Sequence, residues 1–262
     1  MRLYAAGGMN GDIDRSFAEA GLRWRLLTYI ECKSPCNSHY WLSEEPSTPL
    51  FLDSGAYSAH TMGLDINIDD YCYFIKSNPG RFNPYASLDV IGDWKGSAAN
   101  HNFMVSQGLT PLPTFHLHSP MHELRRLLKE NDYVALGGLV GCPHEKVIAW
   151  LDKCWAVIAD YWPKRIHGFG IGYSILLLRY PWYSADSTSA IFRGGMGLMH
   201  LFEDAHVSGV HNVVHARATM DGSYMDTNGS RHIDRRRHNV VQQVNLERYI
   251  TDVWRMRGIA WS

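Results

Sequence analysis

Apolar and polar positions alternate along the chain in a pattern that predicts short strands separated by helices. The predicted strands are β-rich apolar runs at residues 2–6, 25–30, 50–53, 85–89, 112–116, 133–136, 166–169 and 182–186. Between several of these runs, apolar residues recur at helical spacing, at residues 66–77, 98–107, 121–129 and 145–161. This alternation is typical of a parallel sheet covered by helices.

The number of predicted strands favours closure of the sheet into a barrel. Eight strands with intervening helices suit an α/β fold of the (β/α)8, TIM-like type, and 262 residues fit one such domain. We therefore expect a single domain, with the barrel over residues 1–190 and a C-terminal extension over 191–262 that ends in a helix at 244–257. Residues 31–48 are predicted to form a long polar loop. An open, doubly wound sheet is the alternative.

Composition and charge narrow the range of partners and compartments. The formal net charge of −1 excludes a strong overall field for nucleic acid, so any basic footprint must be local. The five cysteines are odd in number and lack a disulfide-framework spacing, which favours thiols in a reducing cytoplasm. No signal-peptide pattern begins the sequence, and no apolar run reaches the roughly 18 residues of a membrane span. We expect a cytoplasmic protein with no membrane contact.

Three predicted strands end on an aspartate, at Asp53, Asp89 and Asp186. In a barrel, the C-terminal ends of the strands build the mouth that holds the active site. Two carboxylates on either side of one sugar carbon are the usual means of breaking a glycosidic bond. The alternative is that each aspartate caps the helix that follows it.

Glycines and histidines follow other predicted strands. Residues 137–141 and 168–172 are rich in glycine, and the bare backbone there would let a planar base lie against the peptide groups. Each glycine cluster alone could equally be a tight turn or a phosphate loop. His116 and His118 lie on one side of the fifth run. Histidines that are satisfied or face a substrate are favoured there over a metal pair.

Taken in order, these segments resemble the tRNA-guanine transglycosylase superfamily. The matching segments are LDSGAYS (52–58), SLDVIGD (87–93), ALGGLVG (135–141), GFGIG (168–172) and YSADSTS (183–189). The likeness is greatest to the phage and bacterial DNA-modifying branch, which inserts 7-deazaguanine bases into DNA. It covers residues 2–190, and the DSGA and ALGG segments are its most specific parts.

The resemblance implies a role for each site residue and a pair of substrates. Asp186 would be the nucleophile and Asp53 the general acid/base, while Asp89 would read the edge of the guanine. Gly137, Gly138 and Leu139 would bind the base. From their places at strand ends, Ser54, Gly55, His116 and Gly170 are also expected to contact substrate. The implied partners are DNA and a 7-deazaguanine base such as preQ0 (7-cyano-7-deazaguanine), with no cofactor. A homodimer is left open.

One departure from the family changes the expected nucleic acid. The tRNA enzymes carry a Cys-x-Cys-x-x-Cys plus His zinc site near the C-terminus, and this sequence has no match to it. Cys32 and Cys36, with His39 nearby, lie in the wrong region and fall short of the four ligands of a structural zinc site. We therefore expect no metal, and DNA is favoured over tRNA as the substrate.

The tail would then supply phosphate contacts. Its segment 230–239 is rich in arginine, and the residues expected to neutralise phosphates are Arg231, Arg235, Arg236 and Arg237. The alternative is a solvated charged loop or a helix face paired with acids.

Three other functions stay open beside DNA base exchange. A glycosidase or nucleoside hydrolase would use the same barrel and carboxylates, with water in place of the incoming base. A transglycosylase could act on tRNA. A nucleic-acid-binding accessory protein would use the carboxylates only as helix caps.

Overall fold

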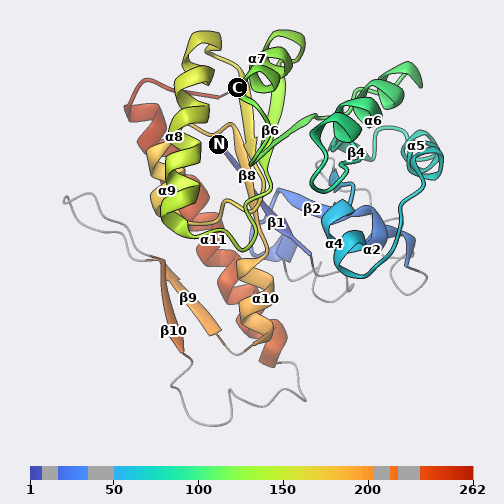
Figure 1. Cartoon of the computed structure of the whole chain (residues 1–262). Coiled ribbons are helices and arrows are strands. Elements are labelled where there is room, and N and C mark those ends of the chain that lie inside the picture. The colour runs from blue at the N-terminus through green and yellow to red at the C-terminus, as the bar shows by residue number, and fades with distance from the viewer. Residues whose placement is uncertain (8–16, 35–49, 197, 203–212, 218–230, 262) are drawn as a thin grey trace. The chain divides into compact units, whose positions relative to one another are not determined.

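The structure is a computed structural model, and it describes residues 1–7, 17–34, 50–196, 198–202, 213–217 and 231–261 (Figure 1). Cys36, His39 and most of the predicted loop at 31–48 lie outside the described residues. The side chain of Arg231 also lies outside them.

The described chain forms one eight-stranded sheet with helices around it. Its strands are β1 (Arg2–Ala6), β2 (Arg25–Thr28), β3 (Leu50–Asp53), β4 (Phe82–Tyr85), β5 (Thr114–His116), β6 (Tyr133–Gly137), β7 (Arg165–Gly168) and β8 (Ser184–Ser187). They follow the order β4-β3-β2-β1-β8-β7-β6-β5. The first and last strands, β1 and β8, are parallel neighbours, as a barrel requires and an open doubly wound sheet does not. A parallel bridge between Ala86 and Leu112 also joins the chain after β4 to the chain before β5. The predicted α/β, TIM-like fold is confirmed.

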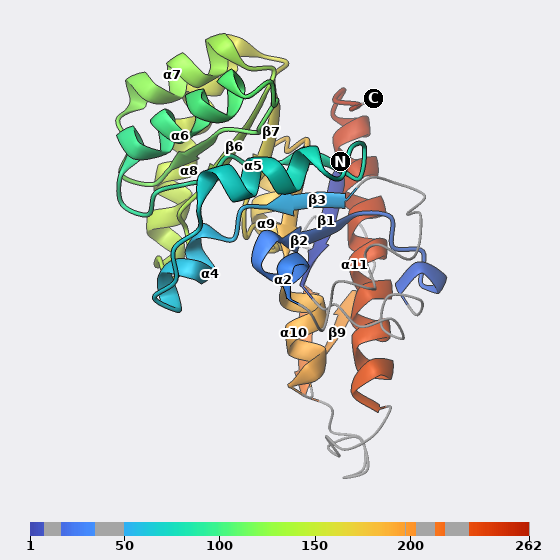
Figure 2. The same ribbon diagram turned by 90° about the vertical axis from the view of Figure 1, so that its right-hand side faces the viewer.

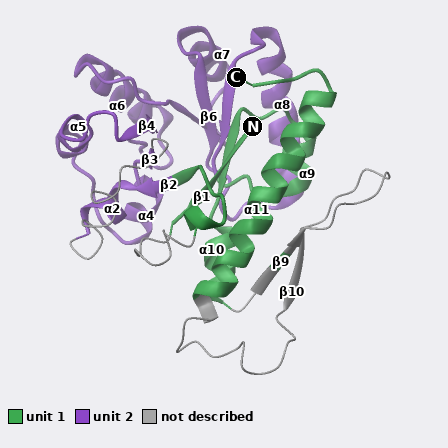
Figure 3. Ribbon diagram, turned by 180° about the vertical axis from the view of Figure 1, so that it is seen from behind, with its two compact units in different colours: residues 1–25, 170–262 green, residues 26–169 purple. Residues whose placement is uncertain are grey.

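Contacts divide the chain into two compact units, shown in different colours in Figure 3. The central unit holds residues 26–169, and the terminal unit holds residues 1–25 and 170–262. The expected single domain stays a prediction, and each unit is described by itself.

The central unit alternates its strands with helices. They are α2 (Tyr29–Lys33), α4 (Ala56–Thr61), α5 (Ile68–Lys76), α6 (Trp94–Ser106), α7 (Met121–Glu130), α8 (His144–Ile158) and the 3-10 turn η1 (Ala159–Tyr161). Of these, α5, α6, α7 and α8 match predicted helical stretches, whereas α2 and α4 were not predicted, and α2 replaces the end of the predicted second strand and the start of the predicted loop. In α7, Leu124, Leu127 and Leu128 are buried along one face, as helical spacing predicts. Residues 134–136 of β6 are fully buried, because strands of a parallel sheet are covered on both faces.

The terminal unit is built around one long helix. Figure 2 shows α11 (Arg231–Met256) running beside α10 (Ser189–Gly195) and β9 (Leu198–Phe202). β9 pairs antiparallel with β10 (Val213–Arg217), and the short helix α9 (Ser174–Arg179) precedes β8. Phe17, Ile191, Val240 and Val244 share a buried apolar cluster, which fixes α11 against α10 and the N-terminal segment.

Two element predictions need correction. The tail was expected to hold no βα unit before residue 244, but α10 follows β8 directly and α11 begins at Arg231. The arginines of residues 231–239 hide the apolar spacing of this helix, because its buried positions there are few. The fourth strand begins at Phe82 rather than at residue 85, since the unfavourable Pro84 masks it.

Candidate functional site

Three of the predicted substrate residues meet in the central unit, at the ends of neighbouring strands. His116 ends β5, and its Nε2 lies 3.1 Å from Oδ2 of Asp89, which follows β4. Gly138, just after β6, has a φ of 78°, and a Cβ added to it would lie 3.5 Å from Cβ of His116. The backbone of β6 therefore lies close against His116, while Asp89 bonds the ring nitrogen. We call these three residues the Asp89–His116–Gly138 cluster.

The strand register sets up this cluster. His116 of β5 is the direct neighbour of Gly137 in β6, and the amide of Leu117 donates to the Gly137 carbonyl at 3.1 Å. A Cβ on Gly137 would lie 3.0 Å from Cγ2 of Thr114, closer than most real contacts. Gly137 therefore allows β6 to pass over the side chain of Thr114.

Electrostatics favour the charged form of His116. Its side chain is 23% exposed and that of Asp89 is 14% exposed. Burial acts to lower the pKa of His116, but the charge of Asp89 and its hydrogen bond together raise that pKa above the usual value. The imidazolium and the carboxylate thus form a partly buried ion pair.

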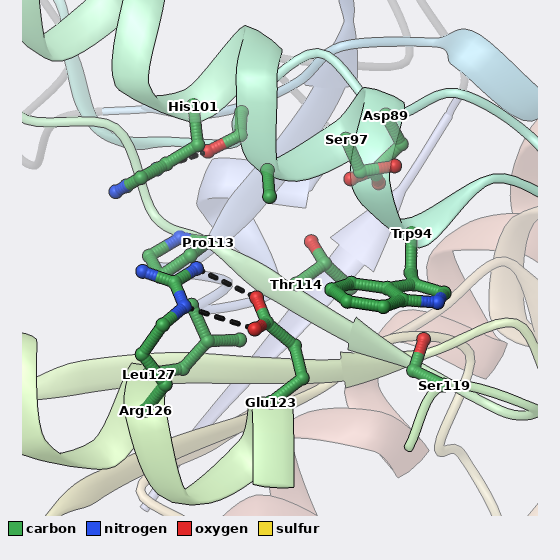
Figure 4. A pocket seen from close by; sticks show the side chains of 12 residues that line it. Asp89, Trp94, Ser97, His101, Pro113, Thr114, Ser119, Glu123, Arg126 and Leu127 are labelled. Carbon is green, nitrogen blue, oxygen red and sulfur yellow. Dashed lines mark hydrogen bonds and ion pairs between the residues drawn. The ribbon is translucent and has the colours of Figure 1, made fainter.

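A small cavity of about 20 Å³ lies beside Asp89, between β5, α6 and α7 (Figure 4). This volume holds one water molecule but no purine ring. Asp89 and Thr114 line the cavity, and Oδ1 of Asp89 and Oγ1 of Thr114 are buried without a hydrogen-bond partner among the described residues. Both atoms have almost no accessible surface, so a ligand or solvent donor does not reach them in this structure.

The polar side chains on the far walls of the cavity form hydrogen bonds with one another. Glu123 accepts from Arg126 at 2.6 and 2.9 Å, and Figure 4 marks this pair with dashed lines. Ser87 Oγ lies 2.8 Å from Nδ1 of the buried His101. Burial, and then the charge of Arg126, lower the pKa of His101, so the ring is neutral near pH 7. The hydrogen bonds of these four residues hold the walls of the cavity together.

Asp53 ends β3 next to a tight turn. Its Oδ1 accepts the amide of Gly55 at 3.3 Å, and Ser54 between them is buried. Gly55 has a φ of 74°, and a Cβ there would lie 3.3 Å from Cγ1 of Ile30. Glycine therefore suits this position for conformation and for space.

A buried tyrosine links Asp53 to the cluster electrostatically. Tyr71 of α5 donates its hydroxyl to the Ala86 carbonyl at 2.9 Å. Burial raises the pKa of Tyr71 well above its usual value, and the charges of Asp53 and Asp89 raise it further. Two of the three predicted carboxylates thus act on one phenol within the central unit.

Asp186 lies on β8 of the terminal unit and is 7% exposed. Its Oδ1 accepts the amide of Gly170 at 3.0 Å. A Cβ on Gly172 would fall 2.3 Å from Oγ of Ser187, so the glycine-rich segment lies directly against the end of β8. Gly170, expected to bind substrate, is placed as the residue that orients Asp186.

The alternative that the three aspartates cap helices is wrong. The N-cap of α4 is Gly55, that of α6 is Asp93 and that of α10 is Thr188. Asp93 accepts the Lys95 amide, whereas Asp89 lies four residues earlier and bonds to His116. The carboxylates of Asp53, Asp89 and Asp186 therefore need another explanation than helix capping.

The expected role of Arg235 is wrong. Arg235 is 1% exposed, and its Nε donates to the Gly194 carbonyl at 3.0 Å, while Nε of Arg236 donates to the Ile191 carbonyl at 3.2 Å. The Gly194 carbonyl lies at the C-terminal end of α10, where an arginine can satisfy the helix end. Buried in this way, Arg235 cannot reach a phosphate.

The other arginines differ in exposure. Arg236 is half-buried, and burial followed by the charge of Arg235 lowers its pKa. Arg237 is half-exposed, with NH2 3.6 Å from a carboxylate oxygen of Glu19. Phosphate contacts by Arg231, Arg236 and Arg237 stay predictions.

Sequence reasoning missed Thr114 and Tyr71. Thr114 lies two residues before His116, so period-two alternation along the strand places both on one face and could have indicated it. Tyr71 carries no local signal, because its role depends on a contact with a distant strand. Leu139 lies half-buried in the turn after β6, where its carbonyl accepts the Cys142 amide at 3.1 Å.

Metal ligation and membrane insertion can be judged for the residues that the structure describes. Within these ranges, no group of three or more His, Cys, Asp or Glu side chains is arranged to hold a metal ion. None of the described helices combines the length and the apolar character needed to cross a lipid bilayer.

The sequence matches no family model and no curated protein. Solved structures do resemble it. One is the alpha subunit of tryptophan synthase from Legionella pneumophila str. Paris, with a TM-score of 0.51 and 7% identity over 94% of this chain and 92% of that chain. At this identity the likeness shows the fold alone, and it agrees with the TIM-like strand order.

Proposed function

We propose that this chain is a base-exchange transglycosylase that replaces guanine in DNA with a 7-deazaguanine base. The observation that carries the proposal is the Asp89–His116–Gly138 cluster at the C-terminal ends of neighbouring strands. TIM-like enzymes place their substrate sites at these strand ends. The order of the segments along the chain, which resembles the transglycosylase superfamily, supports the same conclusion.

The cluster suits a guanine-type base. Guanine and 7-deazaguanine share an edge with two donors, the ring N1–H and the 2-amino group, and a carboxylate oxygen of Asp89 can accept from this edge. Gly137 and Gly138 add peptide groups without side chains, so a planar base can approach them. An enzyme that acts on a base in DNA must take it out of the stack, at a cost of a few kcal/mol that such contacts offset.

Asp186 and Asp53 would carry the bond exchange. A carboxylate oxygen of Asp186 attacks C1′, the C1′–N9 bond breaks, and Asp53 gives its proton to N9 of the leaving guanine. The 7-deazaguanine then loses its N9 proton to Asp53 and displaces the Asp186 ester at C1′. Two inversions give net retention at the sugar. The Gly170 amide fixes the orientation of Asp186 for the attack.

The test is base exchange in vitro. The protein is incubated with duplex DNA and 7-cyano-7-deazaguanine, the DNA is digested, and the nucleosides are identified by mass. We expect the 7-deazaguanine deoxynucleoside to appear with the wild-type protein and to disappear with Asp186→Asn or Asp53→Ala. Asp132→Asn is the matched control. Asp132 directly precedes β6, is exposed, and pairs with Lys164, which directly precedes β7.

Other outcomes separate the competing functions. Release of guanine without incorporation would identify a hydrolase and refute base exchange. Incorporation into tRNA but not into DNA, in a parallel reaction, would support the proposed base exchange but show that the substrate is tRNA. An Asp186→Asn protein that exchanges bases at the wild-type rate would refute the assignment of Asp186 as the nucleophile.

A further inference from the structure

The edge of Asp89 that a base could use is already occupied by a side chain of this protein. Oδ1 of Asp89 is fully buried at the wall of the small cavity, which has no room for a ring. A base can therefore approach only Oδ2. That oxygen lies 3.1 Å from Nε2 of His116.

His116 has few alternatives to this contact. β6 presents only the uncharged Gly137 and Gly138 to it, and Gly138 lies against its Cβ and Cδ2. His101 of α6 and Glu123 of α7, which line the cavity beside Asp89, are engaged elsewhere, since His101 bonds to Ser87 and Glu123 bonds to Arg126. Asp89 is therefore the group whose charge acts on the imidazole.

Resting on the proposed function, we propose that His116 is a proton-operated latch on Asp89. The imidazolium holds Oδ2 of Asp89 while the site has no base, and a donor of a guanine-type base, the N1–H or the 2-amino group, replaces it there. The displaced imidazolium loses the stabilisation of its carboxylate and gives its proton to solvent. His116 is thus a positioning residue that links base binding to proton release.

The latch has a defined pH dependence. A charge-assisted hydrogen bond is about twice as strong as a neutral one, so the protonated latch competes with the base more strongly. The pKa of His116 is raised, so the latch is charged up to a higher pH than an ordinary histidine would be. Below this pKa, the Kd for the base should rise about tenfold for each unit by which the pH falls. Above it, Kd should be constant.

The experiment measures binding of 7-cyano-7-deazaguanine to the full chain by calorimetry between pH 5.5 and 8.5. Two buffers with different ionisation enthalpies count the protons released. We expect up to one proton per base with the wild-type protein. His116→Gln keeps a donor but cannot titrate, so its Kd should vary less than about twofold over this range. His60→Gln, on the exposed face of α4, is the matched control and should keep the wild-type slope.

A second measurement does not depend on the base. The His116 titration is followed by NMR in the wild-type protein and in Asp89→Asn, where it should move to lower pH. An unchanged titration would refute the latch directly, even if a variant binds base poorly.

The two proposals fail in different ways. If the base binds with equal affinity at every pH, or if His116→Gln keeps the wild-type slope, the latch is refuted and the transglycosylase proposal stands. If the base binds at no pH, both are refuted.

Discussion

At the scale of the residue, the buried carboxylates of this protein differ in what neutralises them. Asp186 accepts a hydrogen bond from the backbone amide of Gly170, and Asp89 pairs with the imidazole of His116. Glu247 of α11 accepts the Leu3 amide at 3.2 Å and the indole N–H of Trp24 at 3.0 Å. Burial raises the pKa of Glu247 to about 7, because the two donors and the nearby positive charges only partly offset the loss of solvent.

This raised pKa predicts a pH-dependent stability. The folded protein binds the Glu247 proton more tightly than the unfolded chain, so this stabilisation is present below about pH 4.5 and is lost as the pH rises through about 7. Glu247→Gln should therefore unfold at higher urea than the wild type at pH 8, with an upper limit on the order of 3 kcal/mol. The advantage should shrink towards pH 5.

The control for this prediction is Glu145→Gln on the exposed surface of α8, which should change the unfolding free energy by less than about 0.5 kcal/mol. A Glu247→Gln protein that is no more stable than the wild type at pH 8 would contradict the raised pKa.

A second prediction concerns the glycines after β6. Gly138 and Gly141 have similar positive φ angles of 78° and 75°, but only Gly138 would place a Cβ within 4 Å of other atoms, at Leu117 and His116. Both alanine variants should lose about 1–3 kcal/mol of stability from backbone strain. Only Gly138→Ala should also weaken binding of 7-cyano-7-deazaguanine, by tenfold or more, in the calorimetric assay. Equal loss of binding in both variants would place the base elsewhere.

The sequence identified the members of the candidate site better than their contacts. Asp89 and Gly138 were predicted from a strand end and from the family resemblance, and His116 was predicted from its strand end alone. The ion pair between Asp89 and His116 could not be predicted, because it depends on side-chain rotamers and on a loop of three residues between β4 and Asp89. The orienting role of Gly170 was missed for the same reason, since a backbone amide leaves no trace in the residue type.

At the scale of the element, local patterns predicted most of the sheet and its covering helices. α5, α7 and α8 lie within three residues of their predicted bounds, because each has an apolar stripe. α10 and the first half of α11 were missed. Their stability comes from each other: a Cβ on Gly194 would lie 2.9 Å from Cα of Arg236, so the two helices cross at close range. Tertiary packing of this kind overrides local propensity.

This crossing makes a third prediction, on the arginines of α11. Arg235→Ala removes the buried donor of the Gly194 carbonyl and should lower the unfolding free energy by about 2–4 kcal/mol. Arg237→Ala, two residues on and half-exposed, should change it by less than about 0.5 kcal/mol. Urea titration of both variants makes the comparison. Equal stability of the two would contradict the buried role of Arg235.

At the scale of the whole molecule, the proposed DNA binding would have to rely on a few local cations, because the net charge is only −1. Arg237 is the described arginine of the tail segment whose guanidinium is most available. Removing one phosphate contact weakens binding uniformly across sequences and reduces the salt slope by about one.

Arg237→Ala should therefore weaken binding of duplex DNA and flatten the plot of log affinity against log salt by about one. Fluorescence anisotropy of a labelled duplex at several salt concentrations measures both quantities. Arg255→Ala, on the same helix and paired with Asp252, is the control and should leave the slope unchanged. An unaltered slope for Arg237→Ala would mean that the DNA does not contact the start of α11.

The independence of the proposed catalytic carboxylates from helix capping has a practical consequence. α10 begins at Thr188 without help from Asp186, so an amide at position 186 leaves the start of that helix intact. Such a chemically silent protein can serve as bait. Genomic DNA fragments that this variant retains can be sequenced, and the sequences that they share would give the DNA sequence that the protein prefers.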